Sequence, residues 1–446
     1  MVIANSDSTG TLVSLDDNLH RNKQGLWIPT TVVPPPSNVY RKTALHLPNV
    51  SSVSRTSSTV SLVSLACSDS DSDDDEYHVS TYDDNCWSFD THKNTSKSTE
   101  VLYLPDNSNA TEGETLHVDK AIECLHSESG LMMNNLQLLE SGKHRVYDKA
   151  SSGNHHPRVL YVAQGEVGHT VPHQTDVLMS DRATTCHIVA FRSTSTDTEK
   201  EALSSICHID GTSSAYEQSI YDLVQHHCNY HDNTNHAIEM DIHVLGGYAD
   251  EHGTSVEISN WLMGVLADVA DKYTSSNETG MTMTLQTCAI SSINTTCTFH
   301  GRSEPIGRGF AICCKTGNVF LAKCDKSFVP AISARSSRLF SANSQSGLAC
   351  VHTEQSDCIT IHAFDYSHVK DSFDIRAMLA LPDDLLLQYT STSPDVEDKH
   401  DFCHIMRSTF RFLLQTTPAQ VFGGSSNDCS LQLRRVKGTN TWKRCD

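Results

Sequence analysis

Apolar and polar residues alternate in several stretches between residues 159 and 364, and this alternation predicts β-strands. From Ile238 to Val244 every second residue is apolar, up to the pair Gly246-Gly247, which is the pattern of a strand with one buried face. Residues 184–191 are rich in apolar and β-branched side chains on both faces, as in a central strand. Other strands are expected at residues 159–164, 206–210 and 281–290, and in two hairpins, 310–314 with 319–324 and 348–353 with 358–364.

Helical spacing of apolar residues predicts the elements that cover these strands. The clearest helix begins at Ser214, which forms a capping box with Glu217 and precedes an apolar stripe from Tyr216 to His227. Other helices are expected after Thr254 and at residues 116–125, 131–139 and 402–414. Strands alternate with helices early and form hairpins late, so we predict an α+β fold with a mixed or antiparallel sheet system and helices packed outside.

Composition excludes several classes of protein. The chain has 446 residues, 33 of them Lys or Arg and 54 Asp or Glu, which gives a formal charge of -21. This charge disfavours nucleic-acid binding, since phosphates are neutralised by clustered cations. Apolar runs stay well short of the ~20 residues that span a bilayer, and the polar start after Ile3 predicts that there is no signal peptide. We therefore expect neither a nucleic-acid nor a membrane partner.

The first 113 residues differ in composition from the rest of the chain and are expected to be largely disordered. They include the prolines 34–36, the Ser- and Thr-dense stretch 51–64 and the acidic run 68–76. Low hydrophobicity with concentrated like charge does not offset the entropy of ordering. A regulatory alternative is that Ser68, Ser70 and Ser72 are phosphorylated by an acidophilic kinase. The folded domain is expected at residues 114–446, most clearly from residue 158.

The 16 cysteines are spread along the chain without C-x-x-C spacing, which disfavours a zinc ribbon and a redox pair. We therefore expect a reducing compartment, the cytoplasm or the nucleus.

A cluster rich in histidine suggests a metal site. Carboxylate partners for a metal are not clearly placed near it, so we interpret the cluster as the polar end of a helix and expect neither a metal nor a cofactor. This cluster consists of His226, His227, Cys228, His231 and His236.

Cys186 is the most suggestive single residue, because it follows the polar loop 180–185 and opens a predicted buried strand. A thiol held there can face a cleft while loop N–H groups bind an oxyanion. His208 lies at the end of the next strand and would be the base if the two strands pair antiparallel. The alternative is that Cys186 is an ordinary core cysteine. His187 points to the opposite face and is interpreted as structural.

Six stretches in this order resemble the protein N-terminal asparagine amidohydrolase family, and the resemblance covers residue 158 to the end, more weakly from about residue 115. They are VLYV at 159–162, ATTCHIV at 183–189, HIDGT at 208–212, IHVLGGY at 242–248, STSP at 391–394 and HIMRSTFRFL at 404–413. The resemblance implies a β-sandwich with outer helices, like that of the cysteine deamidases that act on chemoreceptor glutamines. The acidic N-terminal region does not resemble the family.

Carried over by position, the family's nucleophile falls on Cys186, and His208 stands in the place of its catalytic histidine. In the chemoreceptor deamidases a hydroxyl residue six places before the cysteine completes the triad; Ser180 stands there and is expected to orient His208. The connection between Cys186 and His208, around residues 193–200, is longer here than in either family. A longer surface loop is tolerated but reshapes the entrance.

The resemblance implies deamidation of N-terminal asparagine in proteins or peptides to aspartate and ammonia, a reaction that feeds the N-degron pathway. We expect the protein to be a monomer. A free N-terminus requires an acidic partner, for which Glu166, Asp210 and Asp250 are candidates. Asp210 has an alternative role as a cap of the next helix. Two other functions remain open: deamidation of internal Gln or Asn side chains, and a non-catalytic adaptor that acts through its acidic tail.

Overall fold

The computed structural model describes fourteen ranges of the chain, and the structural statements below concern these. They are residues 19–21, 27–29, 129–140, 144–147, 157–196, 200–231, 237–275, 281–299, 301–324, 329–341, 347–370, 373–424, 429–437 and 439–445. The region expected to be disordered, 1–113, lies outside them except for two short strands, β1 (Leu19–Arg21) and β2 (Trp27–Pro29), which pair antiparallel. The helix predicted at 116–125 also lies outside the described residues.

A six-stranded mixed sheet forms the centre of the domain, in the order β10-β9-β7-β8-β5-β15. The strand β7 is antiparallel to both β8 and β9, whereas β10 is parallel to β9 and β15 is parallel to β5. These strands are β5 (Glu166–Thr170), β7 (His187–Ser195), β8 (Leu203–Ile209), β9 (Ile238–Gly246), β10 (Met281–Ile290) and β15 (Ala349–His352).

A second sheet has five strands in the order β3-β14-β13-β6-β4. Its members are β3 (Arg145–Tyr147), β4 (Val159–Tyr161), β6 (Val177–Ser180), β13 (Phe310–Cys313) and β14 (Val319–Cys324). Leu160, Leu178 and Phe310 of this sheet share one buried cluster with Ile188 and Ile206 of the larger sheet. The two sheets therefore pack face to face around a common apolar core, whose burial is the main source of stability.

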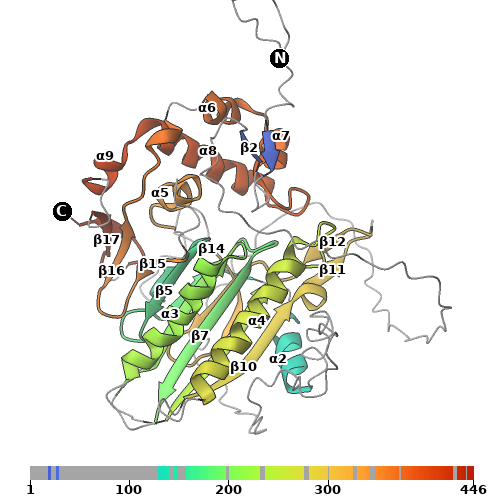
Figure 1. Cartoon of the computed structure of the whole chain (residues 1–446), viewed down its shortest axis with the longest axis vertical. Helices are drawn as coiled ribbons and strands as arrows, with labels where there is room; N and C mark the ends of the chain where they lie inside the picture. The colour runs from blue at the N-terminus through green and yellow to red at the C-terminus, as the bar shows by residue number, and fades with distance from the viewer. Residues whose placement is uncertain are drawn as a thin grey trace, which may run out of the picture. The chain divides into compact units, whose positions relative to one another are not determined.

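Two long helices cover the other face of the six-stranded sheet, α3 (Ser214–His231) and α4 (Thr254–Ser275), as Figure 1 shows. Ile220 and Leu223 of α3 and Leu262 of α4 pack with Val189 and Phe191 of β7 in a second buried cluster. A shorter helix, α2 (Ser129–Leu139), lies against β10, where the Asn135 side chain binds both the N–H and the C=O of Cys288. The apolar stripe of α3 thus packs against the sheet, as its helical spacing predicts.

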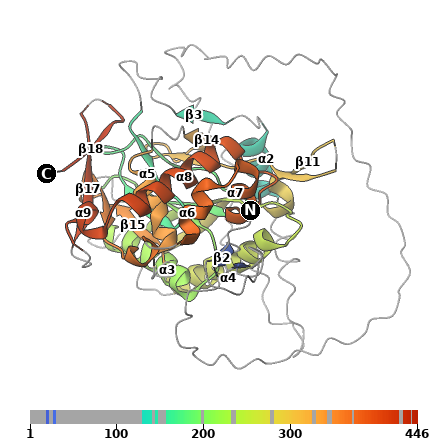
Figure 2. The same ribbon diagram turned by 90° about the horizontal axis from the view of Figure 1, so that it is seen from above.

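The last part of the chain adds a group of helices and a small sheet, which Figure 2 shows from above. The helices are α5 (Ile332–Ser336), α6 (Phe373–Ala380), α7 (Asp383–Thr390), α8 (Lys399–Gln415) and α9 (Pro418–Phe422). The sheet consists of β16 (Cys358–His362), β17 (Ser430–Arg435) and β18 (Trp442–Arg444). The buried face of α8, which includes Met406 and Phe410, joins the core between the two larger sheets. Within the described residues, no helix combines the length and the apolar character needed to cross a bilayer.

Smaller elements connect these layers. They are the strands β11 (Thr295–Cys297) and β12 (Ser303–Pro305), which pair antiparallel, and the 3-10 helices η3 (Ser291–Asn294), η4 (Ser337–Phe340) and η5 (Ser367–Val369).

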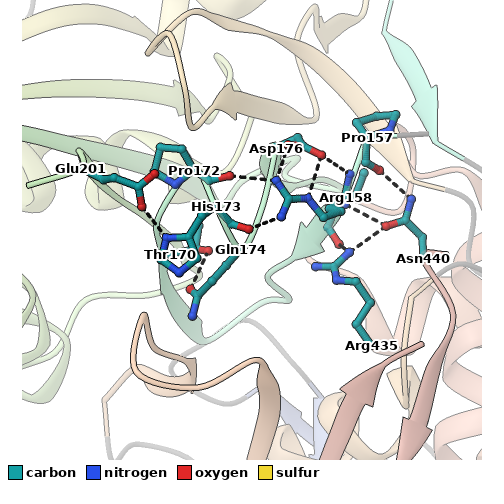
Figure 3. Close-up of polar contacts among 11 residues, drawn as sticks. Pro157, Arg158, Thr170, Pro172, His173, Gln174, Asp176, Glu201, Arg435 and Asn440 are labelled. Atoms are coloured by element: carbon teal, nitrogen blue, oxygen red, sulfur yellow. Dashed lines mark hydrogen bonds and ion pairs between the residues drawn. The ribbon is translucent and has the colours of Figure 1, made fainter. Parts of the chain in front are cut away.

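The C-terminal hairpin holds the beginning of β4, as Figure 3 shows. Asn440 accepts a hydrogen bond from the Val159 N–H at 2.9 Å and donates one to the Pro157 carbonyl at 2.7 Å. Arg435 donates to the Val159 carbonyl at 2.8 Å. Arg158 turns the other way and forms an ion pair with Asp176, with 2.7 Å between Nη2 and Oδ1. These contacts anchor the first residues of β4.

The structure confirms the α+β class and most of the predicted elements, but one predicted hairpin is wrong. Residues 348–353 and 358–364 do not pair with each other: β15 pairs parallel with β5, and β16 pairs antiparallel with β17. Alternation of apolar residues identifies a strand but not its partner, and here the partner strands lie far away in the sequence. The hairpin 310–314 with 319–324 is confirmed as β13 and β14.

A buried ion pair ties α5 to the start of β5. Glu166 and Arg335 are almost fully enclosed, with exposed side-chain fractions of 1% and 0%, and Nε of Arg335 lies 3.0 Å from Oε2. Arg338 lies 3.5 Å from the same carboxylate, which also accepts the Ala163 N–H at 2.9 Å. Burial pushes the pKa of Glu166 upward, but the two guanidinium groups outweigh it and hold the pKa below its usual value.

We expect replacement of Arg335 by Met to lower the free energy of unfolding by roughly 3–5 kcal/mol, because Glu166 is left buried without its partner. The double variant Glu166→Gln, Arg335→Met should lose less. The folded-state pKa of Glu166 is depressed, so its stabilisation is present above the unfolded-state pKa and is lost as the pH falls; the double variant should lack this part of the acid sensitivity. Urea titrations at two pH values measure both effects. If Arg335→Met were at least as stable as the double variant, this account would be contradicted.

Candidate functional site

A cleft lies where the edge of the core meets the C-terminal helices. Its floor is formed by the loop between β6 and β7 and by the end of β8, and its walls by η4, α8 and the segment that follows α7. Its polar and charged lining consists of Gln164, Asp181, Arg182, Thr184, Thr185, Cys186, His208, Asp210, Thr254, Ser336, Thr390, Ser391, Thr392 and Glu397. Phe340, Phe402 and Met406 supply much of the apolar surface.

Cys186 and His208 both line this cleft, as the sequence predicts for a nucleophile and its base. The predicted antiparallel pairing is confirmed, with Ile188 opposite His208 and His187 opposite Ile209. Cys186 lies one residue before β7, which begins at His187 rather than at residue 184. Paired residues point to the same face, and so do residues two apart, so Cys186 and His208 lie on one side of the sheet.

Ser180 makes the contact with His208 that the analogy suggests. Ser180 is the last residue of β6, and its Oγ lies 2.8 Å from Nδ1 of His208. The other ring nitrogen, Nε2, is buried and has no hydrogen-bond partner among the described residues. Burial lowers the pKa of His208 to about 4, so the imidazole is neutral at neutral pH. When Nδ1 donates to Ser180, Nε2 is an acceptor that is ready to take a proton.

The surroundings of Cys186 favour its uncharged thiol over the thiolate. Burial raises its pKa well above the usual range, and the negative charges of Asp210 and Glu397 raise it further. In the described structure no hydrogen bond joins Sγ to His208. Conversion to the thiolate therefore requires a base in reach, a cation in the cleft, or both.

Two glycines at the end of β9 allow the backbone at Cys186 to approach closely. Gly246 has φ +139°, and a Cβ there would lie 2.3 Å from the Cys186 carbonyl oxygen. Gly247 has φ +59° and donates its N–H to the same carbonyl at 2.9 Å. Both positions therefore require glycine, and together they hold the backbone of Cys186 in place.

The loop that leads to Cys186 is held at its other end by hydrogen bonds of Asp181 and Arg182. Asp181 is buried and accepts hydrogen bonds from the Tyr161 hydroxyl at 2.7 Å and from the Cys324 N–H at 2.6 Å. Arg182 has φ +62°, an unfavourable conformation for a residue with a side chain, and donates to the Tyr161 hydroxyl at 3.1 Å and to the Cys324 carbonyl at 3.2 Å. These contacts hold the strained residue in place.

The segment after α7 closes one wall with hydroxyl groups. Ser393 donates to Thr184 Oγ1 at 2.6 Å, and Thr185 lies 2.9 Å from Thr392 Oγ1. Glu397 ends this wall: its Oε1 accepts from Ser391 at 3.2 Å and from Thr184 at 3.3 Å. Burial raises the pKa of Glu397 to about 7. The sequence analysis did not single out Glu397; the available signal was its place shortly after the Ser391–Pro394 stretch.

Of the three acidic residues proposed for substrate binding, Asp210 alone lines the cleft. It accepts a hydrogen bond from Gln164 at 2.8 Å and another from the Tyr216 hydroxyl, so its contact with α3 is through a side chain and not through a helix N–H. Glu166 is enclosed by Arg335 and Arg338. Asp250 accepts the N–H groups of Thr254 and Ser255, at 3.1 and 2.8 Å, at the start of α4. The contacts of Glu166 and Asp250 argue against the proposed role.

His187 and His227 make structural contacts. His187 points away from the cleft, and its Nε2 lies 2.7 Å from Ser259 Oγ in α4. His227 is buried between Ser193 Oγ at 2.6 Å and Ser205 Oγ at 2.7 Å. Among the described ranges, no group of three or more His, Cys, Asp or Glu side chains is arranged to hold a metal ion. His236 of the histidine-rich cluster lies outside those ranges.

Comparison with known proteins identifies the family of the chain. A model described as protein N-terminal asparagine amidohydrolase matches residues 149–444. The chain belongs to this family.

Similar proteins with the name protein N-terminal asparagine amidohydrolase occur in Sus scrofa, 27% identical, and in Homo sapiens and Mus musculus, each 26% identical. Each similarity covers 57% of this chain and 74% of the relative. The part that matches the amidohydrolase family includes Ser180, Cys186, His208 and Glu397.

We expect Gly246→Ala to lower the free energy of unfolding by roughly 3 kcal/mol or more, because the new Cβ collides with the Cys186 carbonyl. Gly253→Ala is the matched control. Gly253 also has a positive φ, +71°, but nothing lies within 4 Å of an added Cβ, so the expected loss is about 1 kcal/mol. Chemical denaturation measures both values. Equal losses would show that the close approach at Cys186 does not constrain Gly246.

Proposed function

We propose that this chain hydrolyses the side-chain amide of an N-terminal asparagine, giving N-terminal aspartate and ammonia. The family name supports this activity, because it is the activity stated for the relatives. The observation that carries the proposal for this chain is the placement of Cys186 and His208 in one cleft, with Ser180 on the far nitrogen of the imidazole. A buried thiol beside a neutral base suits acyl transfer through a thioester.

The proposed reaction begins when Nε2 of His208 takes the proton of the Cys186 thiol as the sulfur attacks the amide carbon. The carbonyl oxygen becomes an oxyanion held by backbone N–H groups at or near Cys186, each typically contributing about 3 kcal/mol. His208 then returns the proton to the departing amide nitrogen, and ammonia leaves as the thioester forms. A water molecule, activated by His208, attacks the thioester and releases aspartate and the free thiol.

Ser180 acts in this scheme as a positioning residue. Its hydroxyl lies 2.8 Å from Nδ1, on the side of the imidazole opposite to the reacting nitrogen. By accepting a hydrogen bond from Nδ1–H, it favours the tautomer in which Nε2 is unprotonated. Ser180 is fully buried, so water does not compete for this hydrogen bond.

The charge of the cleft supports a substrate with a free amino group. Asp210 and Glu397 both line it, and a blocked or internal asparagine has no positive charge to bring to them. Asp210 therefore remains in the proposal as a substrate-binding residue, whereas Glu166 and Asp250 do not. The second candidate, a deamidase of internal Gln or Asn side chains, uses the same Cys186 and His208 but gains nothing from this negative charge.

The wider setting follows from the same proposal. We expect the sheets and outer helices to be of the cysteine deamidase type, with the larger sheet carrying Cys186 and His208. A thiol nucleophile fits a reducing compartment, so we place the reaction in the cytoplasm or nucleus, where N-terminal aspartate feeds the N-degron pathway. The monomer is expected to act alone on its protein or peptide substrates, without a cofactor.

Short peptides that begin with Asn, Gln or acetyl-Asn test the function directly. We expect conversion of the Asn peptide alone, detected by mass spectrometry, and loss of that conversion in Cys186→Ser and His208→Ala. Cys297→Ser, at an exposed cysteine in β11, is the matched control and should retain wild-type activity. Conversion of acetyl-Asn at a similar rate would favour the internal deamidase instead, and full activity of Cys186→Ser would refute the thioester mechanism.

The pH dependence of kcat tests the role of His208. Its pKa is lowered to about 4, so it remains able to accept a proton well below the usual histidine pKa of ~6.5. At saturating Asn peptide, we expect no loss of kcat with a midpoint near 6.5 and a decline only as the pH approaches 4. Ser180→Ala should lower kcat by roughly tenfold or more by releasing the ring. An acid limb centred near 6.5 in the wild type would contradict the buried neutral base.

A further inference from the structure

The charges around the cleft do not cancel. Asp181 and Arg182 form an ion pair, with 3.4 Å between Nη1 and Oδ1. The other two carboxylates in the lining, Asp210 and Glu397, form no ion pair with any described residue. Arg308 lies near enough to lower the pKa of Glu397, but its Nη1 donates to the Val396 carbonyl. The cleft therefore carries surplus negative charge that a cationic ligand would balance.

The two unpaired carboxylates differ in how much of their hydrogen-bonding capacity is free. Both oxygens of Asp210 already accept side-chain donors, Oδ1 from Tyr216 and Oδ2 from Gln164. In Glu397 both hydrogen bonds, from Ser391 and Thr184, go to Oε1. No described residue donates to Oε2 of Glu397. A cationic donor that enters the cleft finds its free acceptor there.

Glu397 also lies at a suitable place relative to the nucleophile. Thr184, which donates to Glu397, is two residues before Cys186, and the negative charge of Glu397 acts on the Cys186 thiol. In asparagine only Cα and Cβ separate the α-nitrogen from the amide carbon. When that carbon is in contact with Sγ, the α-ammonium group must lie among the nearest neighbours of Cys186.

We propose that Oε2 of Glu397 binds the α-ammonium group of the substrate and thereby restricts the enzyme to unblocked N-termini. This inference rests on the proposed deamidation of N-terminal asparagine. Glu397 is then a specificity residue, and the hydroxyls of Thr184 and Ser391 hold its carboxylate through Oε1.

Recognition by Glu397 would also assist the chemistry. Burial raises the pKa of Glu397 to about 7, and an ammonium group beside it favours the ionised carboxylate. The same positive charge offsets the negative potential that raises the pKa of the Cys186 thiol. The thiolate would form more readily when a substrate with a free N-terminus is bound, so a blocked peptide is disfavoured in kcat as well as in binding.

The test compares two peptides that differ only at the α-nitrogen: one begins with asparagine, and in the other a hydrogen atom replaces the amino group. We expect the wild type to prefer the amino peptide in kcat/KM. In Glu397→Gln this preference should fall by roughly 10- to 100-fold, the value of a hydrogen bond between charged groups. The rate with the desamino peptide should not fall and should rise modestly, because that peptide makes no ion pair with Glu397 and loss of the Glu397 charge removes one cause of the raised pKa of the Cys186 thiol.

Two further variants make the result specific. Glu397→Asp keeps the charge and should retain most of the preference, which a purely structural role of Glu397 does not predict. Asp210→Asn should reduce the ratio by much less than Glu397→Gln does, because both oxygens of Asp210 already accept hydrogen bonds from Tyr216 and Gln164 and only its charge acts on the ammonium group. An unchanged ratio in Glu397→Gln, or a ratio abolished by Asp210→Asn, would overturn the inference. Failure of the wild type to convert the asparagine peptide would instead refute the proposed function itself.

Discussion

The register of one central strand governs the candidate site. Antiparallel pairing of β7 with β8 places Ile188 opposite His208, and pairing with β9 places His187 opposite Gly246. Cys186, one residue earlier, therefore shares a cleft with His208 and rests on the glycine pair at 246–247. A slip of one residue would turn every side chain of β7 to the other face and would exchange Cys186 for His187. The apolar layers on both sides of the sheet make such a slip costly.

The fold also sorts acidic side chains according to their partners. Glu166 is neutralised by arginines, Asp181 is paired with Arg182, and Asp250 binds the first turn of α4. Each of these carboxylates is occupied by a structural task. Asp210 and Glu397 are left to face the thiol, where they raise its pKa. In the proposed reaction, a positive charge that enters the cleft would offset this effect on the thiol, as a substrate with a free N-terminus would do.

Local sequence patterns predicted much of this architecture, because period and capping are local properties. The buried stripe of α3, the strand β9 and the pairing of β7 with β8 agree with the predictions from spacing and order. The contact of Ser180 with His208 agrees with the analogy. Contacts between residues far apart in the sequence were harder to predict. β15 pairs with β5, which lies much earlier in the chain, and Glu166 is bound by Arg335, a contact that no local pattern reveals. Glu397 was missed for the same reason, since its exposure to the cleft depends on hydrogen bonds to Thr184 and Ser391.

The most direct measurement is the identification of the covalent intermediate. The protein is mixed with a peptide that begins with asparagine, quenched in acid during turnover, digested and examined by mass spectrometry. The account predicts an acyl group, equal to the peptide less ammonia, on the fragment that contains Cys186, and its absence from His208→Ala. Turnover of the peptide with the acyl group on another cysteine, or with Cys186 never modified, would contradict it.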